Sequence, residues 1–262
     1  MMKVLQFNFL KNPYLRIVFS ISIIVIVSTS FIFLFNSLNK IMLSENPHFI
    51  IRKILIKGSV LLKARESQVF QYGMIKPNQT NLFALNLKEL RKKISSLPIV
   101  ESATISRKLP DTVIITISER IPRVGFNYHG RRWYADENGV VFSAASYGQI
   151  RRDLPLVVGF SAPDVITEGE YVEKLIFPAK LSAIANRYYP EFIIQRIDLS
   201  YKTHIVLKLH PLDSYDYYTV IFPKEKAFEK FALFKWAYLK SLAENTGKRI
   251  FDLRFEGQVV TR

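Results

Sequence analysis

The sequence contains no cysteine among its 262 residues, so neither disulfide bonds nor thiolate metal sites can form. This absence fits a domain that lies outside the cytoplasm, where free thiols are prone to oxidation. Histidine is also scarce, and His48, His129, His204 and His210 lie too far apart in sequence to give a metal-ligand spacing. The sequence therefore predicts no bound metal and no cofactor.

Sequence motifs of catalysis are missing as well. There is no G-x-S-x-G elbow, no P-loop, no H-E-x-x-H and no S-x-x-K with its companion motifs. Asp136 and Glu137 are adjacent carboxylates, but their position beside Asn138-Gly139 favours a solvated turn over a catalytic pair. We therefore predict a protein that is not an enzyme, although an active site assembled from distant residues stays an open alternative.

Acidic residues are few relative to basic ones, and the formal net charge is +15. The lysines and arginines are scattered, with only short clusters such as 91–93 and 131–132. There is neither an RNP-like aromatic signature nor a zinc finger, so we expect no nucleic-acid partner. Attraction to anionic lipid, to an anionic wall polymer or to an acidic partner explains the charge as well.

One long apolar run stands near the N-terminus. No charged residue occurs between Ile17 and Asn39. About 20 apolar helical residues, each rising about 1.5 Å, cross a hydrocarbon core of about 30 Å. The run is longer than the apolar region of a signal peptide and lacks a small-residue cleavage site, which favours a retained transmembrane helix at 17–38 over a cleaved signal.

The flanking residues predict the direction of this helix. Lys3, Lys11 and Arg16 precede it with no acid among them, which is the positive-inside pattern. We expect residues 1–16 to form a cytoplasmic tail and residues 39–48 to form a linker on the outer side of the membrane.

The next stretch, up to Pro122, combines strand and helix patterns. Val113, Ile115 and Ile117 alternate with more polar residues after the turn signal Pro110-Asp111. The predicted elements are a strand at 50–58, a helix at 64–72, a helix at 87–97 and a hairpin with strands at 100–107 and 113–118. The order β-α-α-β-β places two helices on one face of a small three-stranded sheet.

The remaining sequence is mostly β. The turn signal Asn138-Gly139 separates predicted strands at 125–134 and 139–142. The expected elements after it are a strand at 156–159, a helix at 171–188, strands at 193–199, 203–210 and 217–222, a long helix from 228 that ends at Gly247, and a strand pair within 249–260. The helix-spaced aromatic residues Phe228, Phe231, Phe234 and Trp236 favour core packing over a partner-binding stripe.

These segments resemble the FtsQ/DivIB family of bacterial cell division proteins over nearly the whole chain. The sequence markers that carry the resemblance are Ile54-Leu55-Ile56-Lys57-Gly58, the segment from Leu97 to Thr112 running into Glu119-Arg120-Ile121-Pro122, the segment from Trp133 to Phe142, and Asp252-Leu253-Arg254-Phe255. The resemblance implies an α+β fold with a single N-terminal transmembrane helix, a β-α-α-β-β POTRA domain at 49–122, and a mainly antiparallel FtsQ-type β domain with flanking helices at 123–262.

The resemblance also implies a function. A protein of this kind is a non-enzymatic scaffold in the inner membrane at the division septum, with a cytoplasmic N-terminus and most of the chain outside. It links early and late division proteins and binds an FtsB/FtsL-type pair by β-strand addition. Two alternatives are another POTRA-containing secretion or assembly factor, which would need a large membrane barrel, and a membrane-anchored cell-wall enzyme.

The terminal stretch from Ile250 to Val260 is the candidate docking site. Read as one strand at the end of the chain, it has no later segment to pair with, so one side stays an open edge that a partner strand can fill. The resemblance implies that an FtsB-type partner binds there. The alternative is an internal strand with Phe255 in the core. The residues predicted to bind the partner are Arg254, Phe255, Glu256, Gly257, Gln258, Val259 and Val260.

Overall fold

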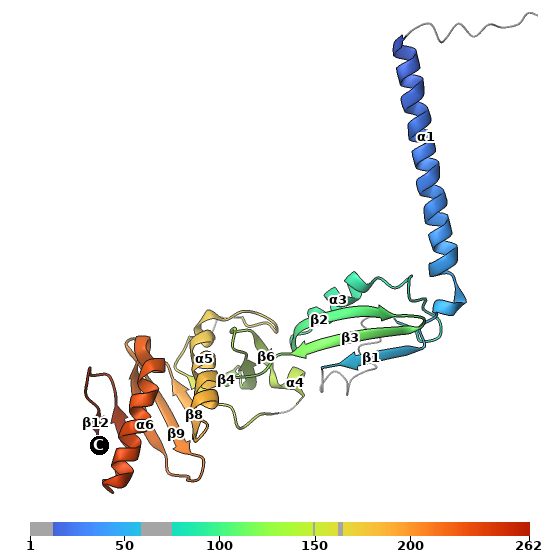
Figure 1. The fold of residues 1–262 in the computed structure, drawn as a ribbon. Helices are drawn as coiled ribbons and strands as arrows, with labels where there is room; N and C mark the ends of the chain where they lie inside the picture. The colour runs from blue at the N-terminus through green and yellow to red at the C-terminus, as the bar shows by residue number, and fades with distance from the viewer. Residues whose placement is uncertain (1–12, 59–74, 149, 162–164) are drawn as a thin grey trace, which may run out of the picture.

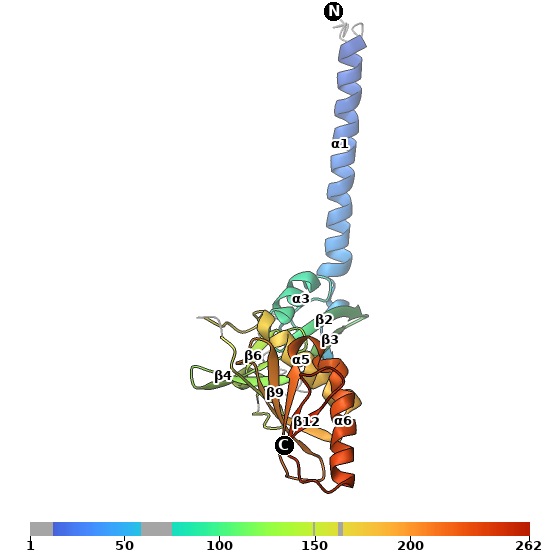
Figure 2. The same ribbon diagram turned by 90° about the vertical axis from the view of Figure 1, so that its left-hand side faces the viewer.

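The structure, a computed structural model, describes residues 13–58, 75–148, 150–161 and 165–262. Figures 1 and 2 show a long helix that rises from one end of an elongated body built around two sheets. The smaller sheet lies next to the helix, and the larger sheet carries the C-terminus at the far end. The predicted α+β class is confirmed, and the residues that form each part can be followed from the sequence pattern.

The first helix, α1 (Pro13–Asn39), contains the predicted apolar run. Together with the π-helical turn at Lys40–Ser44 it provides one helix long and apolar enough to cross a membrane, from Ile17 to Ser44, with a mean hydropathy of 2.7. The described side chains of its apolar run are exposed rather than packed against the body. Within the residues that the structure describes, the prediction of a single candidate transmembrane helix is therefore confirmed.

The segment after α1 is held against the smaller sheet's domain by one buried side chain. Asn81 donates from its amide nitrogen to the carbonyl oxygens of Leu43 (3.0 Å) and Asn46 (2.9 Å), while its amide oxygen accepts from the Phe83 backbone (2.8 Å). A 3-10 turn at Pro47–Phe49 then leads into the domain. The stretch predicted as a linker is thus mostly helical turns, and it is fastened to the folded domain at its outer end.

The smaller sheet has the strand order β1-β3-β2. Its strands are β1 (Lys53–Lys57), β2 (Val100–Lys108) and β3 (Thr112–Glu119), and the helix α3 (Leu87–Ser95) packs against one face. β3 pairs parallel with β1 and antiparallel with β2, so the predicted hairpin supplies the central strand and one edge. The predicted helix at 64–72 lies outside the described residues.

Side-chain alternation sets the buried face of this sheet. Ile56, Ile115 and Ile105 form one rung across the three strands, and the Ile115 side chain is fully buried. Thr116 follows on the opposite face and is exposed. Leu90 and Ile94 of α3 close the core from above, as their spacing of four predicts.

The larger sheet has nine strands in the order β12-β11-β10-β9-β8-β7-β4-β5-β6. The strands are β4 (Val124–Tyr128), β5 (Arg131–Ala135), β6 (Val141–Ser143), β7 (Leu156–Val158), β8 (Phe192–Asp198), β9 (His204–Pro211), β10 (Tyr218–Pro223), β11 (Ile250–Asp252) and β12 (Val260–Thr261). Most neighbours are antiparallel, but β7 runs parallel to both β4 and β8, and β11 runs parallel to β10. The helices are α4 (Ala144–Tyr147), α5 (Glu173–Tyr188) and α6 (Ala227–Ala243), with a 3-10 turn at Lys224–Lys226.

Two helices build the core of the larger sheet. Leu175 and Leu181 of α5 and Phe231 and Phe234 of α6 are buried in one cluster with the strand side chains. This supports core packing for two of the four helix-spaced aromatic residues. Phe228 is partly buried, whereas Trp236 is 58% exposed and belongs to the surface.

Two expectations for this region were wrong in detail. Residues 125–134 are not one strand, because Gly130 has a φ of 72° and turns the chain between β4 and β5. Asp136 is not solvated: its side chain accepts from the backbone amides of Asn138 and Val140 and from the Arg120 guanidinium at 2.7 Å. The carboxylate closes a turn and at the same time binds the end of the smaller sheet's domain.

The two sheets are also joined by apolar packing. Tyr134 and Phe142, from β5 and β6, are fully buried in the same cluster as Ile99 and Ile117 of the smaller domain. Leu154 belongs to this cluster as well. The boundary predicted near Pro122 therefore falls at a joint where side chains from both sides share one core.

Candidate partner-docking edge

The larger sheet has one protected edge and one bare edge. At the β6 end, the Val141 amide donates to the Glu170 carbonyl and the Gly169 amide donates to the Val141 carbonyl, at 2.9 and 2.8 Å. A loop therefore covers that edge. At the other end β12 pairs only with β11 among the described residues, so its outer side is free to accept another strand.

The residues from Ile250 to Val260 do not form one strand, so this expectation was wrong. β11 ends at Asp252, a turn follows, and the chain returns as β12 antiparallel to β11. Gly257, with a φ of 67°, adopts the left-handed conformation that such a reversal needs. Among the described residues, the bare edge is consequently formed by Val260 and Thr261 of β12, and β11 is internal.

The direction of the backbone groups on β12 follows from its pairing. Arg262 and Ile250 exchange both backbone hydrogen bonds, at 2.9 and 3.0 Å. Because hydrogen-bonded and non-hydrogen-bonded pairs alternate in an antiparallel ladder, Val260 also faces β11 and Thr261 presents its amide and carbonyl outward. Thr261 is therefore the β12 residue whose backbone is placed to bind an added strand.

Asp252 and Arg254 fix the start of the turn. The Arg254 guanidinium donates to both carboxylate oxygens of Asp252, at 2.7 to 3.1 Å, and the Arg254 amide donates to the same carboxylate. These hydrogen bonds hold the pKa of the Asp252 carboxyl below its ordinary value. Phe251 and Leu253, on either side of Asp252, are fully buried. The Asp-Leu-Arg segment thus anchors the turn to the sheet.

Lysines on and before α6 hold the turn from the other side. The Lys230 ammonium donates to the carbonyl oxygens of Leu253 and Phe255, the latter at 2.8 Å. Lys226 pairs with Glu256 at 2.8 Å. The turn is therefore positioned by contacts on two sides.

A groove runs between α6 and the terminal turn. Its described lining residues are Leu233, Trp236, Ala237, Lys240, Ser241, Glu244, Thr246, Gly257, Val259 and Thr261. Trp236 is exposed there, and Lys240 lies over its ring at 5.4 Å from the centroid. A strand added beside β12 would place alternate side chains toward this groove.

The structure brings the predicted binding residues into one short loop and strand, with differing exposure. Phe255 is 49% exposed and is not a core residue. Arg254, Glu256, Gly257 and Gln258 are exposed. Val259 packs partly against the core, and Val260 is half-buried with its backbone facing β11. Sequence reasoning missed Thr261 and favoured core packing for Trp236, which is exposed. The signal that could have found Thr261 is Gly257, which divides the apparent strand.

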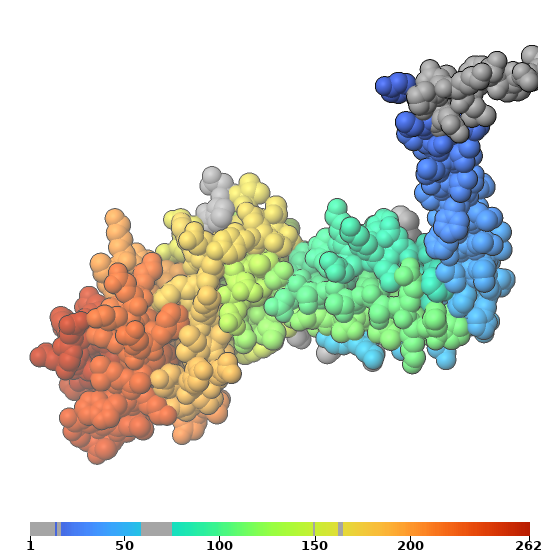
Figure 3. Space-filling model, turned by 45° about the horizontal axis from the view of Figure 1, so that its top comes forward, coloured from blue at the N-terminus to red at the C-terminus, as the bar shows by residue number. Residues whose placement is uncertain are grey.

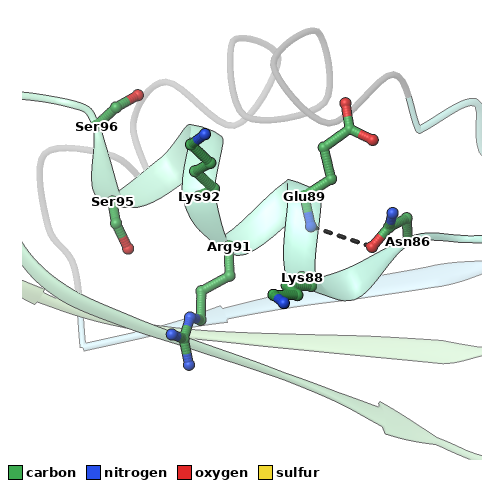
Figure 4. Close-up of a pocket in the computed structure, with 7 residues that line it drawn as sticks. All are labelled: Asn86, Lys88, Glu89, Arg91, Lys92, Ser95 and Ser96. Carbon is green, nitrogen blue, oxygen red and sulfur yellow. Dashed lines mark hydrogen bonds between the residues drawn. The ribbon is translucent and has the colours of Figure 1, made fainter.

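A second surface hollow surrounds the polar face of α3 (Figure 4). Asn86 caps this helix by accepting from the Glu89 amide at 3.1 Å. The other side chains drawn are Lys88, Arg91, Lys92, Ser95 and Ser96, and Arg91 and Lys92 extend to different sides of the helix. In the described part of the chain, no group of three or more His, Cys, Asp or Glu side chains is arranged to hold a metal ion.

Comparison with known proteins relates part of the chain to a protein family. Residues 49–120 match the model of the POTRA domain, FtsQ-type. Cell division protein FtsQ of Geobacter sp. (strain M21) is 29% identical over 116 residues, covering 44% of this chain and 41% of that protein. Over these stretches the chain is similar to proteins of the FtsQ/DivIB family. The predicted FtsQ/DivIB resemblance is therefore confirmed.

Other FtsQ/DivIB proteins match in the same way. Cell division protein FtsQ of Zymomonas mobilis is 35% identical over 78 residues, which cover 30% of this chain and 24% of that protein. Cell division protein DivIB of Clostridium tetani is 29% identical over 97 residues, which cover 37% of this chain and 36% of that protein. The chain thus spans less than half the length of these curated FtsQ/DivIB relatives.

Proposed function

We propose that this protein is a non-enzymatic, single-pass membrane scaffold of the bacterial division machinery. Its similarity to FtsQ/DivIB proteins and the candidate transmembrane helix support a membrane-anchored division role. The positive residues before the apolar run at 17–38 support a cytoplasmic N-terminus at residues 1–16 and an external location for the two folded domains. In this proposal the POTRA domain comprises residues 49–122, the β domain comprises residues 123–262, and the protein works at the division septum.

The proposed partner is an FtsB/FtsL-type complex, and the proposed binding mode is strand addition at β12. The observation that carries this proposal is the contrast between the two edges of the larger sheet, because a loop covers β6 while β12 is bare. Natural proteins normally protect edge strands, so a bare edge beside an exposed tryptophan is best explained by a partner that covers it. Main-chain hydrogen bonds would provide affinity, and the groove along α6 would select side chains.

A proline scan of β12 tests this proposal. Thr261→Pro removes an outward amide donor and should weaken binding of the purified FtsB/FtsL-type complex from the same organism while leaving the melting temperature unchanged. Val260→Pro removes an inward donor and should instead lower the melting temperature, because it breaks the ladder with β11. Undiminished affinity of a folded Thr261→Pro protein would exclude β12 as the docking strand.

Val259 is a second position for a proline substitution, and there the change should affect both partner binding and stability. Continuing the alternation beyond Val260 turns the Val259 backbone outward, but its side chain packs against the core. Val259→Pro should therefore weaken binding and also reduce stability. A titration that reports partner affinity and melting temperature for the same preparation separates the two effects.

A further inference from the structure

The helix α3 carries a concentration of positive charge that the proposed function does not use. Lys88, Arg91 and Lys92 are exposed, whereas Lys93 is half-buried and pairs with Glu89 at 3.0 Å. Among the residues that the structure describes, no acid forms an ion pair with the first three cations. Their charge is thus available to an anionic ligand.

The same helix lies on the side of the molecule from which α1 rises. In Figure 1, α3 lies on the side of the smaller sheet toward which α1 extends, over the half of that sheet nearer the larger one, and away from the β12 edge. Figure 3, in which the top of the molecule comes forward, shows the coloured surface of the smaller domain, which includes α3, on the same side as α1. A membrane crossed by α1 therefore has its outer surface on the α3 side of the domain.

The connection between α1 and the domain keeps that surface near. Ile41 and Met42, in the turn directly after α1, are 63% and 64% exposed. Exposed apolar side chains are therefore present up to the edge of the folded domain. Asn81 then binds the carbonyl oxygens of Leu43 and Asn46. With an apolar run that ends at Asn39, a helix that continues to Ser44 and a bonded junction immediately after it, the domain cannot move far from the lipid headgroups.

We infer that the three exposed cations of α3, Lys88, Arg91 and Lys92, which extend to more than one side of the helix, together form a binding surface for the anionic phospholipid headgroups of the membrane that α1 spans. The ammonium and guanidinium groups attract lipid phosphates within the short range that salt screening permits. The tilt of α1 sets the distance between α3 and the bilayer, and lipid binding favours the tilt that brings them into contact.

The expected effect follows from the number of charges. Each Lys or Arg near an anionic membrane surface adds to the binding free energy. Three such residues together should raise the ratio of docked to undocked molecules roughly a hundredfold at moderate salt. The effect should disappear at high salt, because the attraction is between exposed charges. The α3 cations are not part of the β12 edge, so failure of this inference would leave the partner-docking proposal unchanged.

The absence of cysteine makes a direct experiment possible. The full chain is placed in nanodiscs of pure phosphatidylcholine or of phosphatidylglycerol mixed with phosphatidylcholine, with one spin label at Ser95→Cys. The measurement is the accessibility of the label to an aqueous nickel chelate. We expect lower accessibility in the anionic discs, while a label at Ser106→Cys, on the opposite face of the sheet from α3, should be equally accessible in both.

Charge-matched variants decide between local binding and general attraction. Lys88→Gln/Arg91→Gln/Lys92→Gln should abolish the lipid-dependent difference at position 95. Lys180→Gln/Lys202→Gln/Lys224→Gln removes the same charge from exposed positions on the β domain and should preserve the difference. The inference is overturned if the anionic lipid has no effect on the wild-type label, or if both triple variants lose the effect equally, since the net charge alone would then account for it.

Discussion

The ion pair between Arg120 and Asp136 provides the sharpest test of how the two domains are joined. The Arg120 and Asp136 side chains are 18% and 6% exposed, with a distance of 2.7 Å between Nη1 and Oδ2. Arg120 also donates from Nε to the Pro98 carbonyl oxygen at 3.1 Å. Arg120→Ala would remove both contacts and leave a buried carboxylate at the joint.

The magnitude can be worked out from the remaining partners of Asp136. Removing one member of a buried ion pair costs about 3 to 5 kcal/mol when the other charge is left unpaired. Here the amides of Asn138 and Val140 still donate to Asp136 at 2.9 Å, so part of its charge remains compensated. We therefore expect a loss of about 3 kcal/mol in the free energy of unfolding, the lower end of that range.

Urea unfolding of the full chain in detergent micelles measures this loss. The sequence has two tryptophans, and Trp236→Phe leaves Trp133, three residues before Asp136, as the fluorescent reporter of the joint. The matched control is Lys93→Ala, which breaks a helical surface pair and should change the free energy by only a few tenths of a kcal/mol. A loss below about 1 kcal/mol for Arg120→Ala, which is the range of exposed pairs, would refute the reasoning.

Three further outcomes are expected. A reporter that is active only outside the cytoplasm should be active when fused after Arg262, whereas activity of a cytoplasmic reporter at that site would reverse the orientation. Ile115→Ala should cost about 2 to 5 kcal/mol in unfolding free energy because Ile115 is fully buried, and the exposed Thr116→Ala should be nearly silent; equal shifts in urea midpoint would contradict the observed register. Because Arg254 lowers the pKa of Asp252, their contact should stabilise the β11–β12 pair above the ordinary carboxyl pKa and be lost as the pH falls below about 4. Hydrogen exchange of residues 250–261 should report that loss, and Asp252→Asn should remove the pH dependence.

The smaller domain was largely predictable because its elements are encoded locally. The alternation around Ile115 and the spacing of Leu90 and Ile94 each define a face without knowledge of the rest of the chain. The parallel pairing of β1 with β3 and the insertion of β7 between β4 and β8 are long-range choices. No local pattern of residues specifies them.

The terminal site was predictable in place but not in form. Phe255 and Val259 read as one strand with the residues before them, and only Gly257 indicates a reversal. The pairing that makes Thr261 the outward residue depends on hydrogen bonds across β11 and β12. The prediction for Asp136 was wrong for a related reason, because its burial depends on Arg120, a partner sixteen positions away that directly follows β3 of the smaller sheet.

The hydrogen bonds by which Asn81 holds the segment after α1 have a mechanical consequence. The chain between α1 and the first sheet is held by bonds to Leu43 and Asn46, and the next joint is held by the shared core of Tyr134 and Phe142. A candidate transmembrane helix tied in this way turns together with the folded domain beside it instead of rotating independently of that domain. A force applied at the β12 edge would therefore be transmitted through both joints and would rotate or tilt α1.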